Sequence, residues 1–563
     1  MSTMMAPSLS QRGDRPSFSQ KVDRLSALPD DALVRVLSHL VSDEAARTSA
    51  LSRRWRAVHE AVPVINLVDT KTDYQNCNLD ELKVCFDLQV TSAILCKGMT
   101  TPIRTFCLSI YEPPYKLLDQ WIATAVNSGV EYLDIKLRYR DMSRSLCPFD
   151  MSHGASADFD QWDRNRYTKT DRRIFHCPTL RRLRLKNWTL DLPGDVAVES
   201  LETLCLVRIM DPNGMLQKLI SSCPRLANLT LQECPSIKEI TVPSPRLQSF
   251  AMICCHNASS VELHSTCVQS LHYKGGLPPR NSPLFRVANY QGIKAMTIDI
   301  CENLCTKGSG EVAPITKLVR RCTKLMYLHL SLHPSMAYYN SLFTSVLRGL
   351  RSLTHLSLQG CLPTDHAIRS VTAFLLNTTN LKVLSLSPLG PEPSKEMSSH
   401  FSDAESDINP YSESDSGSDT EPYGESDADP DAGSYTDTDG HSDADTDGQS
   451  DADLDGEPDT KPKDGAIDNR VEYSIRIPES LWRTHVRCLD RSVRRISIGN
   501  YKGRPLEKML ARFLLSRSAA LDEFSVTLAA GLYAQKDEIA KELASWRWNR
   551  CTRVTCKLQR KSC

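Results

Sequence analysis

A short apolar pattern recurs along most of this chain. In Leu226-Ala-Asn-Leu-Thr-Leu-Gln-Glu-Cys234, leucines occupy the first, fourth and sixth positions and a cysteine occupies the ninth. This spacing is too tight for one face of a helix. It predicts a short strand in which Leu229 and Leu231 point the same way and Leu226 enters from the preceding turn.

The same apolar-x-x-apolar-x-apolar spacing recurs fifteen times between Val62 and Cys556. From Leu180 to Leu381 most steps between matches fall within the period of about 20–29 residues typical of leucine-rich repeats, and the others are slightly longer. One such unit cannot bury its apolar face, so a stacked solenoid is expected. The matches begin at Val62, Ile103, Val130, Leu180, Leu201, Leu226, Leu247, Val268, Ile293, Leu325, Leu353, Leu381, Val493, Leu521 and Cys551.

Helical periodicity fills many of the intervals between these strands. Apolar residues there return at i, i+3 and i+4, which predicts a repeat of strand, turn and helix. Two intervals between matches are longer than the rest. The interval from Val62 to Ile103 contains a helix-like stretch at 79–88, and the interval from Val130 to Leu180 is expected to loop out over 140–176. The predicted helices cover 215–222, 312–321, 339–349, 366–376, 506–516 and 535–546.

Residues 25–58 form a separate helical unit ahead of the repeats. Pro29 and two aspartates open a first helix, a second begins near Asp43, and Ser52 can cap a third. Three helices in so few residues bury little apolar surface, so this unit is expected to need a partner. Its apolar positions are Leu28, Leu33, Val36, Leu37, Leu40, Leu51, Trp55 and Val58.

The segment LPDDALVRVLSHL…TSALSRRWRAV closely resembles the F-box of plant F-box/leucine-rich-repeat proteins, although Val41-Ser42 replaces a turn that often contains proline. That resemblance implies docking on a Skp-type adaptor and, through it, on a cullin ubiquitin ligase. The alternative is that the matching residues only hold a helical bundle together; this is favoured for Leu51 and Val58, and the adaptor role for Leu28 and Pro29. The positions that match adaptor-binding or F-box core residues are Leu28, Pro29, Leu33, Val36, Leu37, Leu40 and Trp55.

Two further features fit the same resemblance. Cysteines recur three residues ahead of a strand at Cys177, Cys223 and Cys322, and after a strand at Cys234 and Cys361, as in the cysteine-containing repeats of F-box proteins. The tail from residue 488 onward resembles the FBD region found at the end of many plant F-box proteins. Its periodicity indicates terminal repeats of the same solenoid.

One acidic segment separates the two runs of repeats. Residues 391–464 contain 24 acidic and three basic residues, although the whole chain has a net charge of zero. They lack the apolar residues that could offset chain entropy, so we expect disorder. The expected organisation is 1–22 disordered, 23–61 F-box, 62–390 solenoid, 391–470 acidic insertion and 471–563 FBD-like terminal repeats.

Several possible sites lie in this acidic insertion and in a basic run earlier in the chain. Four serines followed by acidic residues resemble acidophilic kinase sites: Ser402, Ser426, Ser442 and Ser450. A calcium loop starting at Asp443 fails because its twelfth residue is Leu454. The basic run 164–184 could bind an acidic substrate, a phosphate ligand or the chain's own acidic insertion, or could form only solvated loop and strand surface.

The remaining patterns predict no chemistry by the chain itself. Cys301-x-x-x-Cys305 lacks a paired second half, so no metal site is expected, and no phosphate-binding loop, nucleophile or cofactor motif is found. No run of residues is long and apolar enough for a membrane span, and no nucleic-acid-binding motif is found. Without a secretory signal, the cysteines are expected to be reduced thiols in the nucleus or cytoplasm.

The sequence therefore predicts an α/β protein with a three-helix F-box and a leucine-rich-repeat solenoid interrupted by a disordered acidic insertion. The expected function is substrate recognition for an SCF-type ubiquitin ligase, with an unknown protein substrate and no catalytic site. The alternative is a non-degradative leucine-rich-repeat scaffold or regulatory binding protein.

Overall fold

The chain divides into two units in a computed structural model. The first comprises Met1–Pro391 and Ile475–Cys563, and the second comprises Glu392–Ser474. The second unit, with the four serines proposed as phosphorylation sites and the calcium-like loop, lies outside the described residues. The structure describes residues 24–69, 79–98, 101–140, 145–149, 167–278, 283–302, 313–335, 346–361, 367–389, 479, 483–529 and 531–558.

Three short helices form the N-terminal unit: α1 (Asp30–Leu37), α2 (Ser42–Thr48) and α3 (Arg53–Glu60). As predicted, Ser52 caps the third helix, because its hydroxyl accepts a hydrogen bond from the Trp55 N–H at 3.3 Å. The side chain of Arg54 ties this helix to the start of the first, through Asp30 and the carbonyls of Ser26 and Leu28. The apolar core consists of Leu33, Leu37, Ala45, Trp55, Val58 and Val62.

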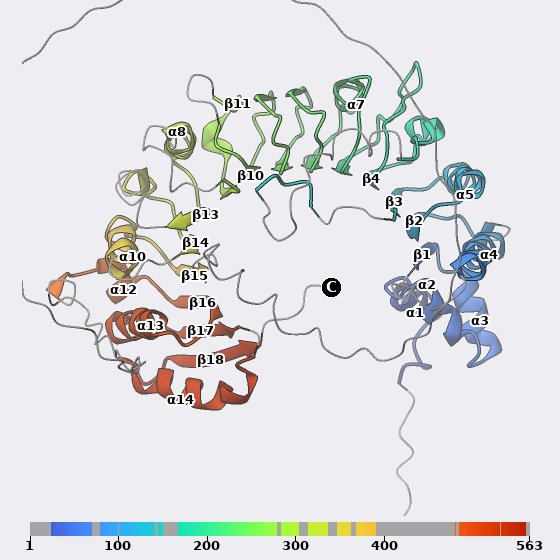
Figure 1. Ribbon diagram of the computed structural model, residues 1–563. Coiled ribbons are helices and arrows are strands. Elements are labelled where there is room, and N and C mark those ends of the chain that lie inside the picture. The colour runs from blue at the N-terminus through green and yellow to red at the C-terminus, as the bar shows by residue number, and fades with distance from the viewer. Residues whose placement is uncertain are drawn as a thin grey trace, which may run out of the picture. The chain divides into compact units, whose positions relative to one another are not determined.

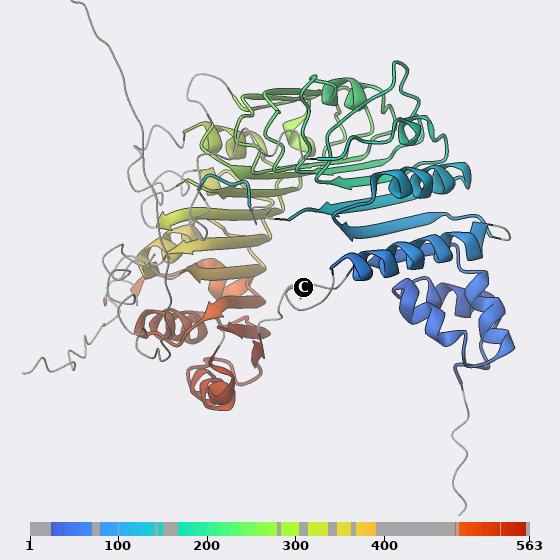
Figure 2. The ribbon, with the colours of Figure 1, turned by 45° about the vertical axis from the view of Figure 1, so that its right-hand side comes forward.

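Fifteen parallel strands form one continuous sheet (Figures 1 and 2). Each of the fifteen apolar matches is followed by one of these strands, which begins two residues after the match. The predicted repeat architecture is therefore confirmed. The strands are β1 (Val64–Val68), β2 (Thr105–Tyr111), β3 (Tyr132–Arg138), β4 (Arg182–Lys186), β5 (Thr203–Val207), β6 (Asn228–Gln232), β8 (Ser249–Ile253), β10 (Ser270–Gly275), β12 (Ala295–Ile300), β13 (Tyr327–Ser335), β14 (His355–Cys361), β15 (Val383–Leu389), β16 (Arg495–Tyr501), β17 (Glu523–Leu528) and β18 (Arg553–Leu558).

The strand register stacks the apolar positions into two continuous rows. Leu229 of β6 pairs with Leu204 of β5 and Phe250 of β8, and Leu231 lies in the next row. All four side chains are almost completely buried in one hydrophobic core. Burying each such side chain contributes about 1.5–3 kcal/mol, so stability is distributed along the array through contacts between neighbouring repeats.

Most of the helices of the repeats lie along the outer side of this sheet (Figure 1). The long α4 extends well beyond the predicted stretch 79–88, and α5 was not predicted. No helix among the described ranges is both long and apolar enough to cross a membrane. The helices are α4 (Leu79–Gly98), α5 (Tyr115–Asn127), α7 (Leu216–Ser221), α8 (Ala313–Arg321), α10 (Ala367–Leu376), α12 (Arg487–Arg491), α13 (Pro505–Arg517) and α14 (Lys536–Ser545), with short 3-10 turns η1 (Arg172–His176), η2 (Tyr290–Gly292) and η6 (Tyr533–Gln535).

The expectation of one helix per repeat is wrong in the middle of the array. There the outer elements are the strands β7 (Glu239–Val242), β9 (Ser260–Leu263) and β11 (Phe285–Val287), which form a second parallel sheet. For β7 and β9 the physical reason is repeat length, because steps of 21 residues between inner strands leave too few residues for two turns and a helix. β11 lies in a step of 25 residues, as does α7, so length alone does not determine the outer element there.

A left-handed backbone conformation recurs directly after the inner strands. Its φ angles are 47° at Glu112, 64° at Asn187, 52° at Arg208, 51° at Glu233 and 52° at Cys254. These residues follow β2, β4, β5, β6 and β8. They place a row of side chains along one edge of the sheet.

The residues before and after the acidic insertion share the same sheet. β15 pairs in parallel with β16, and the hydroxyl of Ser497 donates a hydrogen bond to that of Ser385 at 2.9 Å. Behind the sheet, the Cys488 thiol donates to the Leu375 carbonyl at 3.2 Å. The C-terminal strands therefore extend the sheet without a break in pairing.

Candidate functional site

The seven F-box positions predicted from the sequence fall into three groups by burial. Leu33, Leu37 and Trp55 are buried in the small core, so they can influence a partner only by shaping the surface. Val36 and Pro29 are exposed. The remaining two, Leu28 and Leu40, are partly buried and pack against that core.

The expectation that Leu51 belongs to the core is wrong, whereas Val58 is buried as predicted. The side chain of Leu51 is 68% exposed and that of Leu25 is 50% exposed. Leu51 lies in the turn that connects α2 to the N-cap Ser52, so it precedes the helix whose inner face carries Trp55 and Val58. Exposed leucines on so small a unit, together with Val36 at 44%, are apolar surface available to a partner.

The second candidate surface is the strand face that the helices leave uncovered, which we call the open face. Along most strands the apolar residues are buried, and most of the residues between them are partly or fully exposed. The strand register aligns these intervening residues across all fifteen strands. The apolar pattern in the sequence identified only the buried positions of each strand. The residues that alternate with them must point to the opposite face, so the open face could have been predicted from the same pattern.

Hydroxyl and imidazole groups dominate the C-terminal half of the open face. One row crosses β10 to β14 as His272, Thr297, His329 and Ser357. Nδ1 of His329 lies 2.8 Å from the Ser357 hydroxyl, within hydrogen-bond distance. Burial lowers the pKa of both histidines, and their proximity lowers that of His329 further. The row continues through Ser385, Ser497, Ser525 and Thr555.

Basic groups concentrate at the N-terminal half of the open face, on β3 and β4. Arg182 pairs with Tyr132 in register, and Lys186 pairs with Lys136. Among the described residues, no carboxylate lies within ion-pair distance of Arg182 or Lys186. Burial, followed by repulsion from Arg208, lowers the pKa of Lys186. Lys136 is paired with Asp134 at 3.2 Å.

The basic run predicted from the sequence is split between two surfaces. Arg172 binds Asp191 through two hydrogen bonds of 3.0 and 2.9 Å, and Arg173 binds Asp171. These local pairs neutralise the part of the run at η1. Two other members of the run, Arg182 and Arg184, lie on β4 of the open face, and Arg164 and Arg166 lie outside the described residues.

A buried ion pair lies at the edge of the open face. Nε of Arg208 is 2.6 Å from Oε2 of Glu233, and the two side chains are only 7% and 11% exposed. The same carboxylate oxygen accepts a hydrogen bond from the Leu146 N–H at 3.2 Å. Residues 145–149, far away in the sequence, therefore cross the strand ends of β5 and β6.

Two family models match this chain. The F-box domain matches residues 25–58, which are the three-helix unit. The model described as FBD-associated F-box protein At5g56370, LRR repeats, matches residues 158–291. The second match covers the central repeats, including those with outer strands.

Curated relatives from Arabidopsis thaliana show the same combination. F-box/LRR-repeat protein 13 is 29% identical over 44% of this chain and 50% of its own length. F-box/FBD/LRR-repeat protein At5g56420 is 30% identical over 41% of this chain and 49% of its own length. Putative F-box/FBD/LRR-repeat protein At3g49480 is 24% identical over 60% of this chain and 70% of its own length. The chain spans about half the length of the first two relatives that it matches.

Proposed function

Because this chain is an F-box/leucine-rich-repeat protein of the plant type, we propose that it is a substrate-recognition subunit of an SCF-type ubiquitin ligase. F-box proteins are generally adaptors of this kind. The F-box would bind a Skp-type adaptor and, through it, a cullin. The open face would bind a protein substrate near the enzyme that carries ubiquitin, so the contribution of this chain is proximity.

The observation that carries the proposal is the exposed apolar surface of the F-box. Val36 and Leu51 are substantially exposed although the unit has a small core of its own. Burying apolar side chains against a partner stabilises a complex by about 25 cal/mol per Å² of area removed from water. A partner helix or groove is therefore the expected occupant of this surface.

Binding to a purified Skp-type adaptor tests this directly with the full chain. We expect the wild-type chain to bind and the double variant Val36→Asp/Leu51→Asp to bind at least about tenfold more weakly, which corresponds to about 1.4 kcal/mol. The matched control is Leu376→Asp, which alters an equally exposed apolar side chain on α10. Failure of the wild-type chain to bind, or equal binding by the double variant, would refute adaptor docking.

The open face is the proposed substrate surface because its side chains are accessible and chemically varied. Arg182 and Lys186, which lack a carboxylate partner among the described residues, favour an acidic segment of the substrate. The hydroxyl row at the other end can supply hydrogen bonds without a net charge. We expect the charge reversal Arg182→Glu to reduce captured substrate and its salt dependence, whereas the exposed control Lys324→Glu leaves both unchanged.

The alternative is a non-degradative scaffold that uses the same open face. Proximity labelling in cells, with and without proteasome inhibition, separates the two functions. For a ligase subunit, some labelled proteins should accumulate on inhibition with the wild-type chain but not with Val36→Asp/Leu51→Asp. Identical sets of stable partners in all four conditions would favour the scaffold.

We propose that the chain has no catalytic site, uses no nucleic acid or membrane as its partner, and acts in the nucleus or cytoplasm. The fifteen-strand array has the geometry of a binding surface. Fractionation of cells that express the full chain tests the location.

A further inference from the structure

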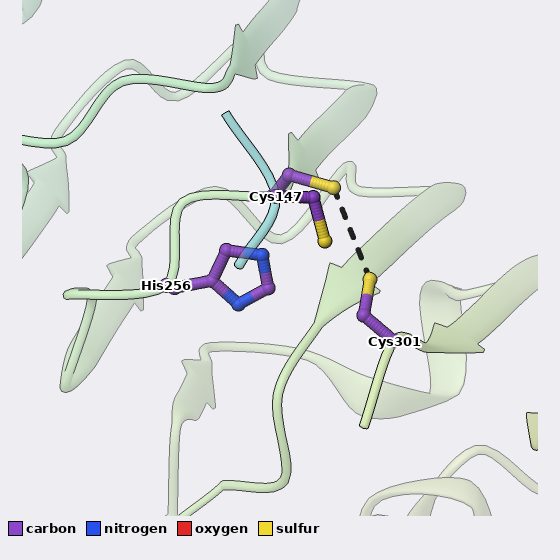
Figure 3. A group of neighbouring side chains, drawn as sticks. Cys147, His256 and Cys301 are labelled. Atoms are coloured by element: carbon purple, nitrogen blue, oxygen red, sulfur yellow. Dashed lines mark hydrogen bonds between the residues drawn. The ribbon is translucent and has the colours of Figure 1, made fainter. Parts of the chain in front are cut away.

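Four potential metal ligands converge at the end of the central strands. The thiols of Cys147, Cys254 and Cys301 and the imidazole of His256 each offer one ligand atom, and these atoms all lie within 4.8 Å of one another. Figure 3 shows three of these residues, labelled, around a common centre. The Sγ atoms of Cys254 and Cys301 are 3.9 Å apart.

Three of the ligands are held by the repeat framework. Cys254 directly follows β8, and His256 lies two residues further on. Cys301 directly follows β12. The N–H of Cys254 donates to the Lys274 carbonyl at 2.6 Å, and that of Cys301 donates to the Gly275 carbonyl at 2.9 Å. The end of β10 therefore fixes both cysteines, one on either side.

The fourth ligand comes from residues 145–149, which are more than a hundred positions earlier in the sequence. The segment is held at the site by the hydrogen bond from Leu146 to Glu233. The ring of Phe149 also packs edge-on against that of His256, with ring centroids 5.3 Å apart. These contacts place Cys147 opposite the two framework cysteines.

The ligand spacing suits a tetrahedral zinc ion. Zinc–sulfur bonds of about 2.3 Å place the sulfur atoms of a tetrahedron about 3.8 Å apart, close to the 3.9 Å between Cys254 and Cys301. Contraction of less than about 1 Å would bring the longest distance in the group to the same value. Both ring nitrogens of His256 are buried and have no hydrogen-bond partner among the described residues, so a ligand would satisfy one of them.

We propose that Cys147, Cys254, His256 and Cys301 form a structural Zn²⁺ site. Three thiolates and one imidazole are the soft and borderline ligands that zinc prefers, whereas calcium and magnesium require oxygen ligands. Four protein ligands fill a tetrahedral coordination shell, which is typical of a structural and not a catalytic site. Such a complex would carry a net charge of −1, and the nearby ammonium of Lys274 is already paired with Asp299 at 3.0 Å.

The site would fasten a long insertion to the open face. Cys147 belongs to the long interval between β3 and β4, and its partners follow β8 and β12, which are three and five strands beyond β4 in the sheet. Zinc would thus fix residues 145–149 across the strand ends of the central repeats. The substrate surface would then include this segment, and its shape would depend on the metal.

Zinc content of the full chain provides the test. The protein is expressed with zinc in the medium and purified under reducing conditions, and its metal content is measured by mass spectrometry. We expect about one zinc ion per chain for the wild-type protein and loss of that ion in Cys254→Ser and His256→Ala. The matched controls Cys267→Ser and His264→Ala alter exposed residues of the neighbouring repeat and should retain it.

Two further measurements make the result independent of variant folding. Cobalt substitution of the wild-type protein should give the intense absorption of a tetrahedral thiolate complex. Chelation of the metal should increase hydrogen exchange in 145–149 while leaving β14 to β17 protected, because repeats communicate only with their neighbours. Absence of bound zinc in the wild-type protein, retention of zinc by Cys254→Ser, or a Cys254–Cys301 disulfide in the reduced preparation would overturn the proposal.

Discussion

The buried ion pair between Arg208 and Glu233 provides the sharpest test of how the open-face edge is held together. Both residues follow neighbouring strands in the left-handed conformation, and both side chains are almost completely buried. The substitution Glu233→Gln removes the negative charge but keeps the size of the side chain and an oxygen acceptor. It therefore removes the negative charge that lies 2.6 Å from Nε of the buried Arg208 guanidinium.

The expected cost follows from the geometry. Two unit charges about 4 Å apart interact by about 4 kcal/mol at an effective dielectric of about 20. Removing one partner of a buried pair costs up to about 3–5 kcal/mol. Replacing both residues, as Arg208→Met/Glu233→Leu, should cost less than the sum of the two single replacements, because each single replacement already removes their mutual interaction.

Hydrogen exchange of the full chain measures this loss locally, since a long repeat array need not unfold in one step. Peptides covering β5 and β6 should lose protection in Glu233→Gln, and peptides covering 145–149 should lose it as well, because the amide oxygen is a weaker acceptor for the Leu146 N–H than the carboxylate. Peptides covering β16 and β17 serve as the internal control. A change below about 1 kcal/mol in the opening free energy of β5 and β6 would refute the assigned role of the pair. A double variant whose loss of stability equals the sum of the two single losses would refute it as well.

Three further predictions address the core, the F-box and the histidine row. Leu231→Ala should destabilise its repeat by about 2–5 kcal/mol in denaturant-dependent hydrogen exchange, because the side chain is fully buried, whereas Leu51→Ala should change stability by less than about 0.5 kcal/mol. Ser52→Ala should destabilise the F-box by about 1 kcal/mol through loss of its N-cap, measured in the same way, and an unchanged exchange rate in α3 would contradict this. Burial lowers the pKa of His272 and His329, so the unfolded chain binds more protons than the folded one. The stability of β10 to β14 should therefore fall as the pH drops below about 6.5. The double variant His272→Gln/His329→Gln should flatten that dependence, and an equally steep pH profile in this variant would count against the prediction.

The strands were predictable because burial imposes a simple rule on their residues. Leu226, Leu229 and Leu231 show the rule: one residue enters the core from the turn and two point inward from the strand. The same requirement acts on every repeat, so the spacing survives even where the residues change, as at Phe524 and Val526 of β17. The sheet and its order therefore follow from local sequence.

The outer layer and the metal ligands were not predictable on the same grounds. The outer strands β7 and β9 depend on the short spacing between two inner strands, and β11 forms at a spacing that elsewhere holds the helix α7, so the apolar pattern of the inner strands does not predict the outer layer. The sequence indicated no metal site at Cys301, because a spacing rule looks for ligands nearby in the chain. The partners of Cys301 come from two other segments, and only the stacking of the strands brings them together.

The residues in the left-handed conformation after the inner strands include both the Arg208–Glu233 ion pair and one member of the cysteine and histidine cluster, Cys254. A residue other than glycine costs about 1–3 kcal/mol in such a conformation, and asparagine tolerates it best. Asn187 fits that preference, but Arg208, Glu233 and Cys254 do not. Each of these three makes a specific contact instead: the first two form the buried ion pair, and the third lies in the thiol and imidazole cluster. Glycine would relieve the backbone strain at all three positions. The contacts of the three side chains must therefore stabilise the fold by more than the strained backbone destabilises it. At this edge of the sheet, interactions other than leucine packing determine the sequence.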